Sequence, residues 1–157
     1  MHIRTFASIV VATLAVAACD SSTAPPSGAR FPELTRQESK WKSQDLHDYL
    51  FDYEHQFAGA AQAARIYVSG DSVVGATDIT TGSALSLDPS FAWPTVDSLF
   101  ARARAALAAK DVNVSVTYDA SLGYPTSIDV SPVEATPAGG SSSKASDLQS
   151  MVVLTAN

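Results

Sequence analysis

The chain of 157 residues contains only one cysteine, Cys19. A single thiol has no partner within the chain, so no intrachain disulfide holds this fold together. Basic residues are also few: ten Lys and Arg stand against sixteen Asp and Glu, and the formal net charge is −6. The basic residues are scattered, which argues against a nucleic-acid footprint and against a polybasic patch for anionic lipid. We therefore expect no nucleic-acid partner.

The first eighteen residues have the parts of a secretory signal. The apolar run over residues 6–16 is shorter than the about 20 residues that a membrane-spanning helix needs, but it fits the about 7–15 of a signal peptide. His2 and Arg4 precede it, and two alanines separate it from Cys19. The tetrad Val-Ala-Ala-Cys resembles the lipobox at which lipoproteins are cut and lipidated. We expect a signal peptide over 1–18 and lipidation of Cys19; the alternative is an ordinary secretory signal with a chance cysteine.

The segment after the cysteine predicts how the domain is held. Residues 20–29 are small, polar or proline residues that cannot build a core, so we expect a lipidated flexible tether over 19–33. The lipid on Cys19 is the only covalent group that the sequence predicts, and no cofactor is expected. Two or more acyl chains anchor a protein stably to a membrane. Together with the secretory signal, the lipid therefore predicts an extracytoplasmic domain on a bacterial membrane. Asp20 resembles an inner-membrane retention signal whose rule varies between lineages, so inner and outer membrane both stay open.

Residues 34–157 are expected to form one domain. Thr35 and Glu38 have the spacing of a capping box at a helix start, and Thr95 is the expected N-cap of a second helix. Residues 49–57 alternate with period two, as a half-buried strand does, and Gly70-Asp71 separates two further strands like a hairpin turn. The expected elements are a helix over 36–47, strands over 49–57, 65–69 and 72–79, a helix after Thr95, strands over 112–118 and 125–130, a mobile loop over 131–146 and a short strand over 151–154.

The order of these elements is α-β-β-β-α-β-β-(β). Such an order predicts an α+β fold: an antiparallel sheet of about five to six strands with two helices packed on one face. Trp41 is expected to fix the first helix to this sheet, because the apolar face of that helix is otherwise thin.

Three stretches, residues 94–100, 114–119 and 122–128, together resemble the family DUF6174, whose members are small bacterial secreted proteins and lipoproteins of unknown function. The best motif is Tyr-Asp-x3-Gly-Tyr-Pro-Thr-Ser-Ile, at residues 118–128. The resemblance covers about residues 36–130 and implies the fold and the location, but no activity. Family members often carry two close cysteines after the first strand, where this chain has Phe-Ala-Gly-Ala-Ala at 57–61.

The motif also supplies the candidate binding residues, Tyr118, Asp119 and Tyr124. A structural interpretation stands beside this one. Asp119 can bond the amides of its own turn, Gly123 can take a positive φ, and the tyrosines can cover the edge of the core. The sequence alone leaves both interpretations open.

Catalysis and metal binding have less support. The polar cluster with the most acidic and histidine residues is Asp45, His47, Asp48, Asp52, Glu54 and His55. Alternation along a strand places Asp52 and Glu54 on the face opposite to His55, so we expect no metal site. No Gly-x-Ser-x-Gly elbow or phosphate loop occurs. We expect a non-enzymatic protein-binding or accessory module with an envelope protein partner; the alternative is a domain that binds a small ligand or a divalent metal.

Overall fold

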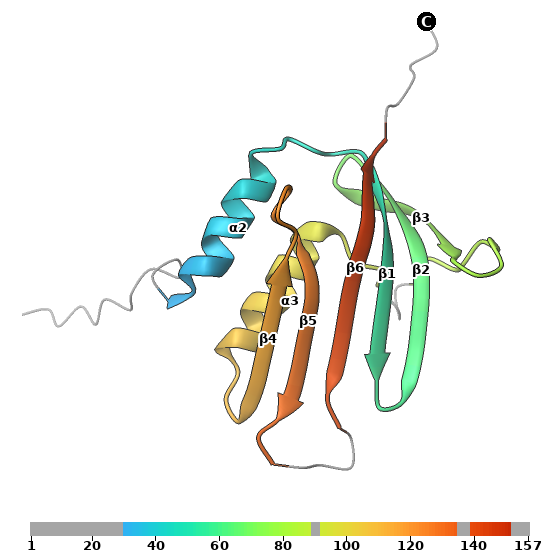
Figure 1. Cartoon of the computed structure of the whole chain (residues 1–157). Helices are drawn as coiled ribbons and strands as arrows, with labels where there is room; N and C mark the ends of the chain where they lie inside the picture. Colours follow the sequence, from blue (N-terminus) through green and yellow to red (C-terminus); the bar gives the residue numbers. More distant parts are fainter. Residues whose placement is uncertain (1–29, 89–91, 135–138, 152–157) are drawn as a thin grey trace, which may run out of the picture.

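A computed structural model describes residues 30–88, 92–134 and 139–151. The predicted signal peptide, Cys19 and the tether up to residue 29 lie outside these ranges. The fold is a six-stranded antiparallel sheet with two helices, in the order α-β-β-β-α-β-β-β (Figure 1). This confirms the predicted α+β class. The elements are α2 Pro32–Lys42, β1 Tyr49–Phe57, β2 Ala60–Ser69, β3 Ser72–Asp78, α3 Val96–Ala108, β4 Val112–Tyr118, β5 Pro125–Pro132 and β6 Ser141–Ser150.

The sheet consists of two three-stranded meanders, each preceded by a helix. Its strand order is β3-β2-β1-β6-β5-β4, so the meanders join where β1 pairs with β6, and β3 and β4 are the two outer strands. Short turns explain the meanders. Gly70 and Asp71 have φ values of 55° and 63°, and Ala58 and Gly59 have 50° and 82°. Positive φ at both central residues is the hairpin turn whose twist matches that of paired strands.

Strand β2 begins earlier than the sequence predicted. It starts at Ala60 and pairs with the whole length of β1, from Phe57↔Ala60 to Tyr49↔Val68. Residues 60–64 contain four alanines, which carry no clear period-two signal. The pairing with β1, rather than the local pattern, therefore sets where β2 begins.

The first helix was predicted too late in the chain. Helix α2 spans Pro32–Lys42, not 36–47, and Phe31 is its N-cap without a side-chain cap. Proline is suited to the first helical turn because the missing N–H would have no helical partner there. Thr35 lies inside the helix, and its hydroxyl donates to the Phe31 carbonyl oxygen at 3.0 Å. The predicted capping box is therefore wrong, and residues 32 and 33, which the prediction assigned to the tether, belong to α2.

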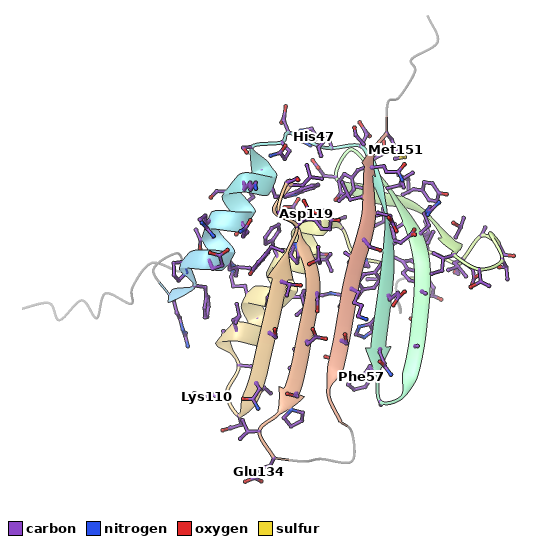
Figure 2. All side chains as sticks on the ribbon, in the orientation of Figure 1. His47, Phe57, Lys110, Asp119, Glu134 and Met151 are labelled. Atoms are coloured by element: carbon purple, nitrogen blue, oxygen red, sulfur yellow. The ribbon has the colours of Figure 1, made fainter. Side chains whose placement is uncertain are left out.

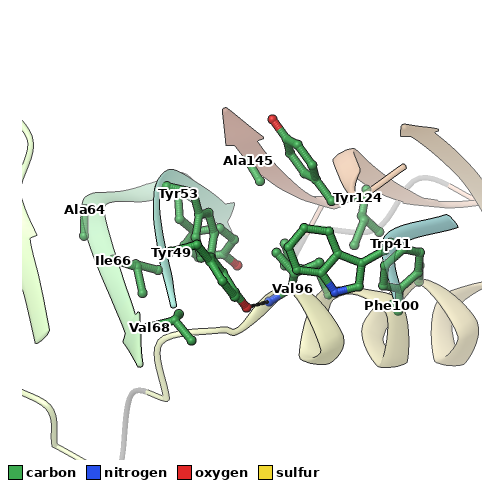
Figure 3. Packing of buried hydrophobic residues seen from close by; sticks show 14 of the residues in the cluster. Trp41, Tyr49, Tyr53, Ala64, Ile66, Val68, Val96, Phe100, Tyr124 and Ala145 are labelled. Atoms are coloured by element: carbon green, nitrogen blue, oxygen red, sulfur yellow. Dashed lines mark hydrogen bonds between the residues drawn. The ribbon is translucent and has the colours of Figure 1, made fainter. Parts of the chain in front are cut away.

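The second helix begins where the sequence predicted. The Thr95 side chain accepts a hydrogen bond from the Ser98 N–H at 3.2 Å, which caps α3. Val96, at the first turn of α3, also donates its N–H to the Tyr49 hydroxyl at 3.1 Å (Figure 3). Burial raises the pKa of Tyr49 to about 12. The first strand of the sheet thus helps to hold the start of the second helix.

The core lies between the sheet and the helices. Tyr49, Phe51 and Tyr53 alternate along β1 and are buried on one sheet face, as the period-two pattern predicted. The Trp41 ring meets the Tyr49 ring edge-on at 5.3 Å between centroids (Figure 3). Trp41 therefore fixes α2 to the sheet, as expected. Within the described ranges, no helix is both long enough and apolar enough to cross a membrane.

The last strand lies where a loop was predicted. Residues 141–150 form β6 between β1 and β5, so the predicted loop over 131–146 is too long. The predicted strand over 151–154 begins just after β6, and residues 152–154 lie outside the described ranges. The serine-rich sequence of β6 gives no hydrophobic signal. It is nevertheless suited to the middle of the sheet, because the small side chains of Ser143 and Ala145 lie opposite His55 and Tyr53 on the helix-covered face.

Candidate functional site

Asp119 organises the turn between β4 and β5. One of its carboxylate oxygens accepts hydrogen bonds from the N–H groups of Ser121 and Leu122, at 2.8 and 2.6 Å. Its own N–H donates to the Tyr124 carbonyl oxygen at 2.9 Å, and its carbonyl oxygen accepts from the Gly123 N–H at 3.0 Å. Figure 2 shows this turn at one end of the sheet, beside α2. These contacts are the ones expected if Asp119 stabilises its own turn, as the structural interpretation of the motif predicted.

The same turn packs closely against α2. Gly123 has a φ of 85°, and a Cβ added there would lie 2.9 Å from the Gln37 carbonyl oxygen. The Lys40 Nζ donates to the Ala120 carbonyl oxygen at 2.6 Å. A side chain at position 123 would therefore push the turn away from the helix.

The two tyrosines of the motif pack against different residues. Tyr124 is only 5% exposed, and its ring lies edge-on to Trp41 at 6.4 Å between centroids. Tyr118 is half-buried, and its ring stacks with Phe100 at 6.4 Å. Burial raises the pKa of both hydroxyls. The three candidate binding residues do not converge on one point, and of the three it is Tyr118 that lines a hollow among the described residues.

That hollow is a groove of about 280 Å³ beside β4. Its walls come from the start of α2, the end of α3 and the helix-covered face of β4. Most of its lining is apolar, with Arg30 and Glu33 at the rim. We call it the β4 groove; its lining residues are Arg30, Phe31, Pro32, Glu33, Leu34, Leu107, Val116 and Tyr118.

The groove adjoins an unpaired strand edge. Among the described strands, β4 has β5 as its only neighbour in the sheet. The Val133 N–H donates to the Asp111 carbonyl oxygen at 3.0 Å, just before the pairing Val112↔Pro132. Antiparallel pairs alternate between bonded and non-bonded positions. The N–H and C=O groups of Val112, Val114 and Val116 therefore point away from β5.

The opposite edge of the sheet is covered. At β3, the Ala76 carbonyl oxygen accepts from the Leu85 N–H at 2.8 Å, and the Asp78 N–H donates to the Ser83 carbonyl oxygen at 2.9 Å. The Asp78 carboxylate holds the intervening turn by accepting from the N–H groups of Thr80 and Thr81, at 2.9 and 2.7 Å. We call residues 79–85 the β3 cover. The cover occupies backbone groups that correspond to the outward-facing groups of β4.

The predicted polar cluster is dispersed by the fold. His47 lies between Asp45 and Asp71, with its Nδ1 2.8 Å from an Asp71 carboxylate oxygen, and these hydrogen bonds raise its pKa. Asp52 pairs instead with Arg65 across β1 and β2, through contacts of 2.7 and 2.9 Å. Throughout the described part of the chain, no group of three or more His, Cys, Asp or Glu side chains is arranged to hold a metal ion.

His55 belongs to a cluster that the sequence did not predict. The Arg102 guanidinium donates to the Tyr53 hydroxyl at 2.7 Å, and that hydroxyl donates to Ser143 Oγ at 3.3 Å. His55 Nδ1 lies 3.0 Å from the same Ser143 oxygen. Burial, followed by the charge of Arg102, lowers the pKa of His55. Ser143 is 88 residues from His55 and fell in the predicted loop, so no local signal connects the two.

The geometry of this cluster favours a structural role. Ser143 is 8% exposed, and its oxygen is already shared by Tyr53 and His55. A serine nucleophile is ordinarily activated by a histidine that a third group orients. Among the described residues, no carboxylate is hydrogen-bonded to the His55 ring. The contacts tie β1, β6 and α3 together beneath the sheet.

Comparison with known proteins identifies the family and nothing narrower. The model of a family of unknown function, DUF6174, matches residues 33–149. The searches of curated proteins and of solved structures returned no match. The match covers most of the chain, including both helices from residue 33 on and nearly all of the sheet. The chain belongs to the DUF6174 family.

Proposed function

We propose that this DUF6174 chain is a membrane-anchored envelope lipoprotein whose domain binds a protein partner without catalysis. The proposal for the anchor rests on the sequence: a short apolar run, small residues and then the only cysteine, Cys19. A polar segment follows and supplies a tether between lipid and domain. The membrane is one partner in this proposal, through the lipid, and an envelope protein is the other.

One observation supports protein binding above the alternatives: β4 is an unprotected edge. Natural sheets protect their edges with charged residues, prolines, bulges or covering segments. The seven residues of β4 contain no charge and no proline, and its outward backbone groups have no strand neighbour among the described residues. An exposed edge of this kind is the surface to which an extended segment adds as another strand.

A small-ligand role has weaker support. The sheet face away from the helices has a hollow whose lining includes Glu54, Gln56, Ala61 and Lys144. Ligand sites are usually concave and mostly apolar with a few converging polar groups. This hollow lies on an open face with charged groups of both signs at its border. We therefore place the protein-binding role first.

The test is crosslinking in living cells followed by mass spectrometry. We expect a specific partner with the wild-type chain and its loss with Val114→Lys, which puts a charge on the β4 edge. Val74→Lys is the matched control, because Val74 is 57% exposed on the other outer strand. Asp119→Ala and Tyr124→Ala test the motif residues in the same experiment. Equal partner recovery from Val114→Lys and wild type would contradict binding at the β4 edge.

The anchor has its own test. Cys19→Ser is expected to abolish metabolic labelling with palmitate and to leave the precursor uncut. Persistent labelling would show that the lipid is elsewhere, and the lipoprotein proposal would then be wrong.

A further inference from the structure

We propose that the partner of the β4 edge is an extended segment in which apolar and uncharged polar side chains alternate, with a carboxylate at the end that meets Arg30. This inference rests on the protein-binding role proposed above and specifies its partner. Four features of the edge carry it: the backbone groups, the two faces of β4, the walls of the groove and the charge at its rim.

The backbone groups set the form of the partner. The outward N–H and C=O groups of Val112, Val114 and Val116 are spaced by two residues, as the Asp111–Val133 hydrogen bond and the β4–β5 register indicate. Only another extended strand presents donors and acceptors at that spacing. A helix uses its own backbone groups internally and cannot match them.

The side chains of β4 set the alternation. Val112, Val114 and Val116 lie on the helix-covered side and are partly exposed. Asn113, Ser115 and Thr117 lie on the other face and are exposed and uncharged. Directly opposed side chains on neighbouring strands lie about 4.5–5.5 Å apart and stabilise the pair when they match. A matching segment therefore alternates apolar residues toward the groove with uncharged polar residues away from it.

The groove walls favour a single strand over a second copy of this chain. Helix α2 lies beside β4 at the outer side of the sheet (Figure 1), and its first residues share the groove with Leu107, Val116 and Tyr118. One added strand needs about 4.8 Å beyond β4. A second copy paired through β4 would bring its own α3, about 10 Å wide with its side chains, to the side of the sheet that α2 already borders.

The rim supplies a charge preference. The Arg30 guanidinium lies 5.4 Å from the centre of the Phe31 ring at one end of the groove. Its neighbour Glu33 is already paired with Arg36 at 2.7 Å. Within the described residues, no carboxylate forms an ion pair with Arg30. A carboxylate on the partner would complement it, and a charge-assisted contact of this kind fixes register as well as adding affinity.

The experiment measures peptide binding to the full chain purified in detergent. The probe is a short peptide that alternates valine and threonine, made with aspartate or with lysine at either end. We expect the best aspartate form to bind at least about tenfold more tightly to wild type than to Val114→Lys, a difference of about 1.4 kcal/mol. Val74→Lys is expected to bind like wild type. Arg30→Glu is expected to reverse the preference between aspartate and lysine.

A second measurement locates the peptide. Amide exchange at Val112, Val114 and Val116 is expected to slow when the peptide is added, because their outward groups become hydrogen-bonded. Protection at β3 instead, or equal weakening by Val114→Lys and Val74→Lys, would overturn the assignment. A dimeric chain that Val114→Lys converts to a monomer would identify a second copy as the occupant and also overturn it.

The outcomes separate this inference from the proposed function. If no alternating peptide binds, yet Val114→Lys still loses a crosslinked partner in cells, the partner chemistry is wrong and the binding role stands. If the partner in cells is also unaffected, both are wrong.

Discussion

The two outer strands of the sheet, β3 and β4, are of equal length but differ in what lies beside them. The β3 cover bonds to the backbone of Ala76 and Asp78. Strand β3 also has an irregular register with β2, and Val74 lies at that irregularity. Strand β4 has a regular register up to Thr117, and although α2 lies beside it, no described segment forms backbone hydrogen bonds with its outer side. Because unprotected edges invite pairing, the contrast supports the proposal that a partner binds at β4 rather than at β3.

The largest expected effect compares one amide from each edge. The Val114 N–H is expected to exchange with solvent on the order of 100-fold faster than the Asp78 N–H, after correction for intrinsic rates. The reason is that the Asp78 N–H donates to Ser83 at 2.9 Å, whereas the Val114 N–H points away from β5. Amide exchange followed by NMR checks this. Equal protection of the two amides would remove the contrast on which the proposed function rests.

Proline substitutions within β4 test which of its backbone N–H groups face β5 and which face outward. Ser115→Pro is expected to lower the free energy of unfolding by about 1–3 kcal/mol more than Val114→Pro, because it removes a donor that faces β5. Proline is tolerated in edge strands where the lost N–H faces solvent. Denaturant unfolding of the two variants measures the difference. The reverse order would mean that the outward residues are Asn113, Ser115 and Thr117.

A third substitution loosens the covered edge. Asp78→Ala removes the acceptor for Thr80 and Thr81, so the Leu85 amide is expected to exchange roughly tenfold faster. Asp119→Ala is the matched control, since it removes an equivalent acceptor from the β4–β5 turn and should leave Leu85 unchanged.

Acid is expected to lower the protection of the Leu85 amide, corrected for intrinsic exchange rates, as Asp78→Ala does. Hydrogen bonds from Thr81 and Thr80 lower the pKa of Asp78 below its ordinary 3.8. A carboxyl whose pKa is lowered by folding stabilises the fold above its unfolded pKa. That contribution is lost as the pH falls through the folded pKa. Leu85 protection that is insensitive to pH down to the folded pKa and below would show that Asp78 does not hold the cover.

The smallest expected effect is a pH dependence at the β2–β3 turn. Hydrogen bonds to Asp71 and Asp45 raise the pKa of His47 above 6.5, so its stabilising contribution is complete below pH 6.5 and is lost as the pH rises through the folded pKa. Because His47 is exposed, the effect is expected to be small: the protection of the Asp71 amide should fall by a factor of less than about ten over that range. His47→Gln should remove the dependence. Strand β4 carries no group that titrates near neutral pH, so the protection of its amides, corrected for intrinsic rates, should stay constant over the same range.

Much of the fold was predictable because local patterns decide it. The alternation of residues 49–57, the hairpin turn at Gly70-Asp71 and the cap at Thr95 each depend on a few neighbouring residues, and all three are confirmed. The start of α2 was missed because Thr35 has the spacing of a cap, while Pro32 supplies an earlier start. Strand β6 was missed because its serines carry no hydrophobic period.

The candidate site was less predictable because it depends on contacts between distant segments. The sequence singled out Tyr118, Asp119 and Tyr124 together, yet the fold places Tyr124 against Trp41 and leaves only Tyr118 beside the β4 groove. The other groove residues come from both helices and have no common motif. The pairing of His55 with Ser143 likewise joins residues whose separation hides any local signal.

The sequence by itself determined the α+β order of elements, the membership in DUF6174 and the prediction of an anchor at Cys19. The order of elements follows from periodicity and turn residues, which act over short stretches of chain. The family membership rests on the motif that resembles the family and on the family match, and the anchor prediction rests on the tetrad that ends in Cys19. Only the tertiary structure decided which strands are outermost, which of the two edges is covered and where the groove lies. Strand order depends on which distant segments pair, and a one-dimensional pattern carries no record of a strand's final neighbour. Thus β4 resembles an ordinary half-buried strand in the sequence, and only the assembled sheet shows that one side of it has no neighbouring strand within the described ranges.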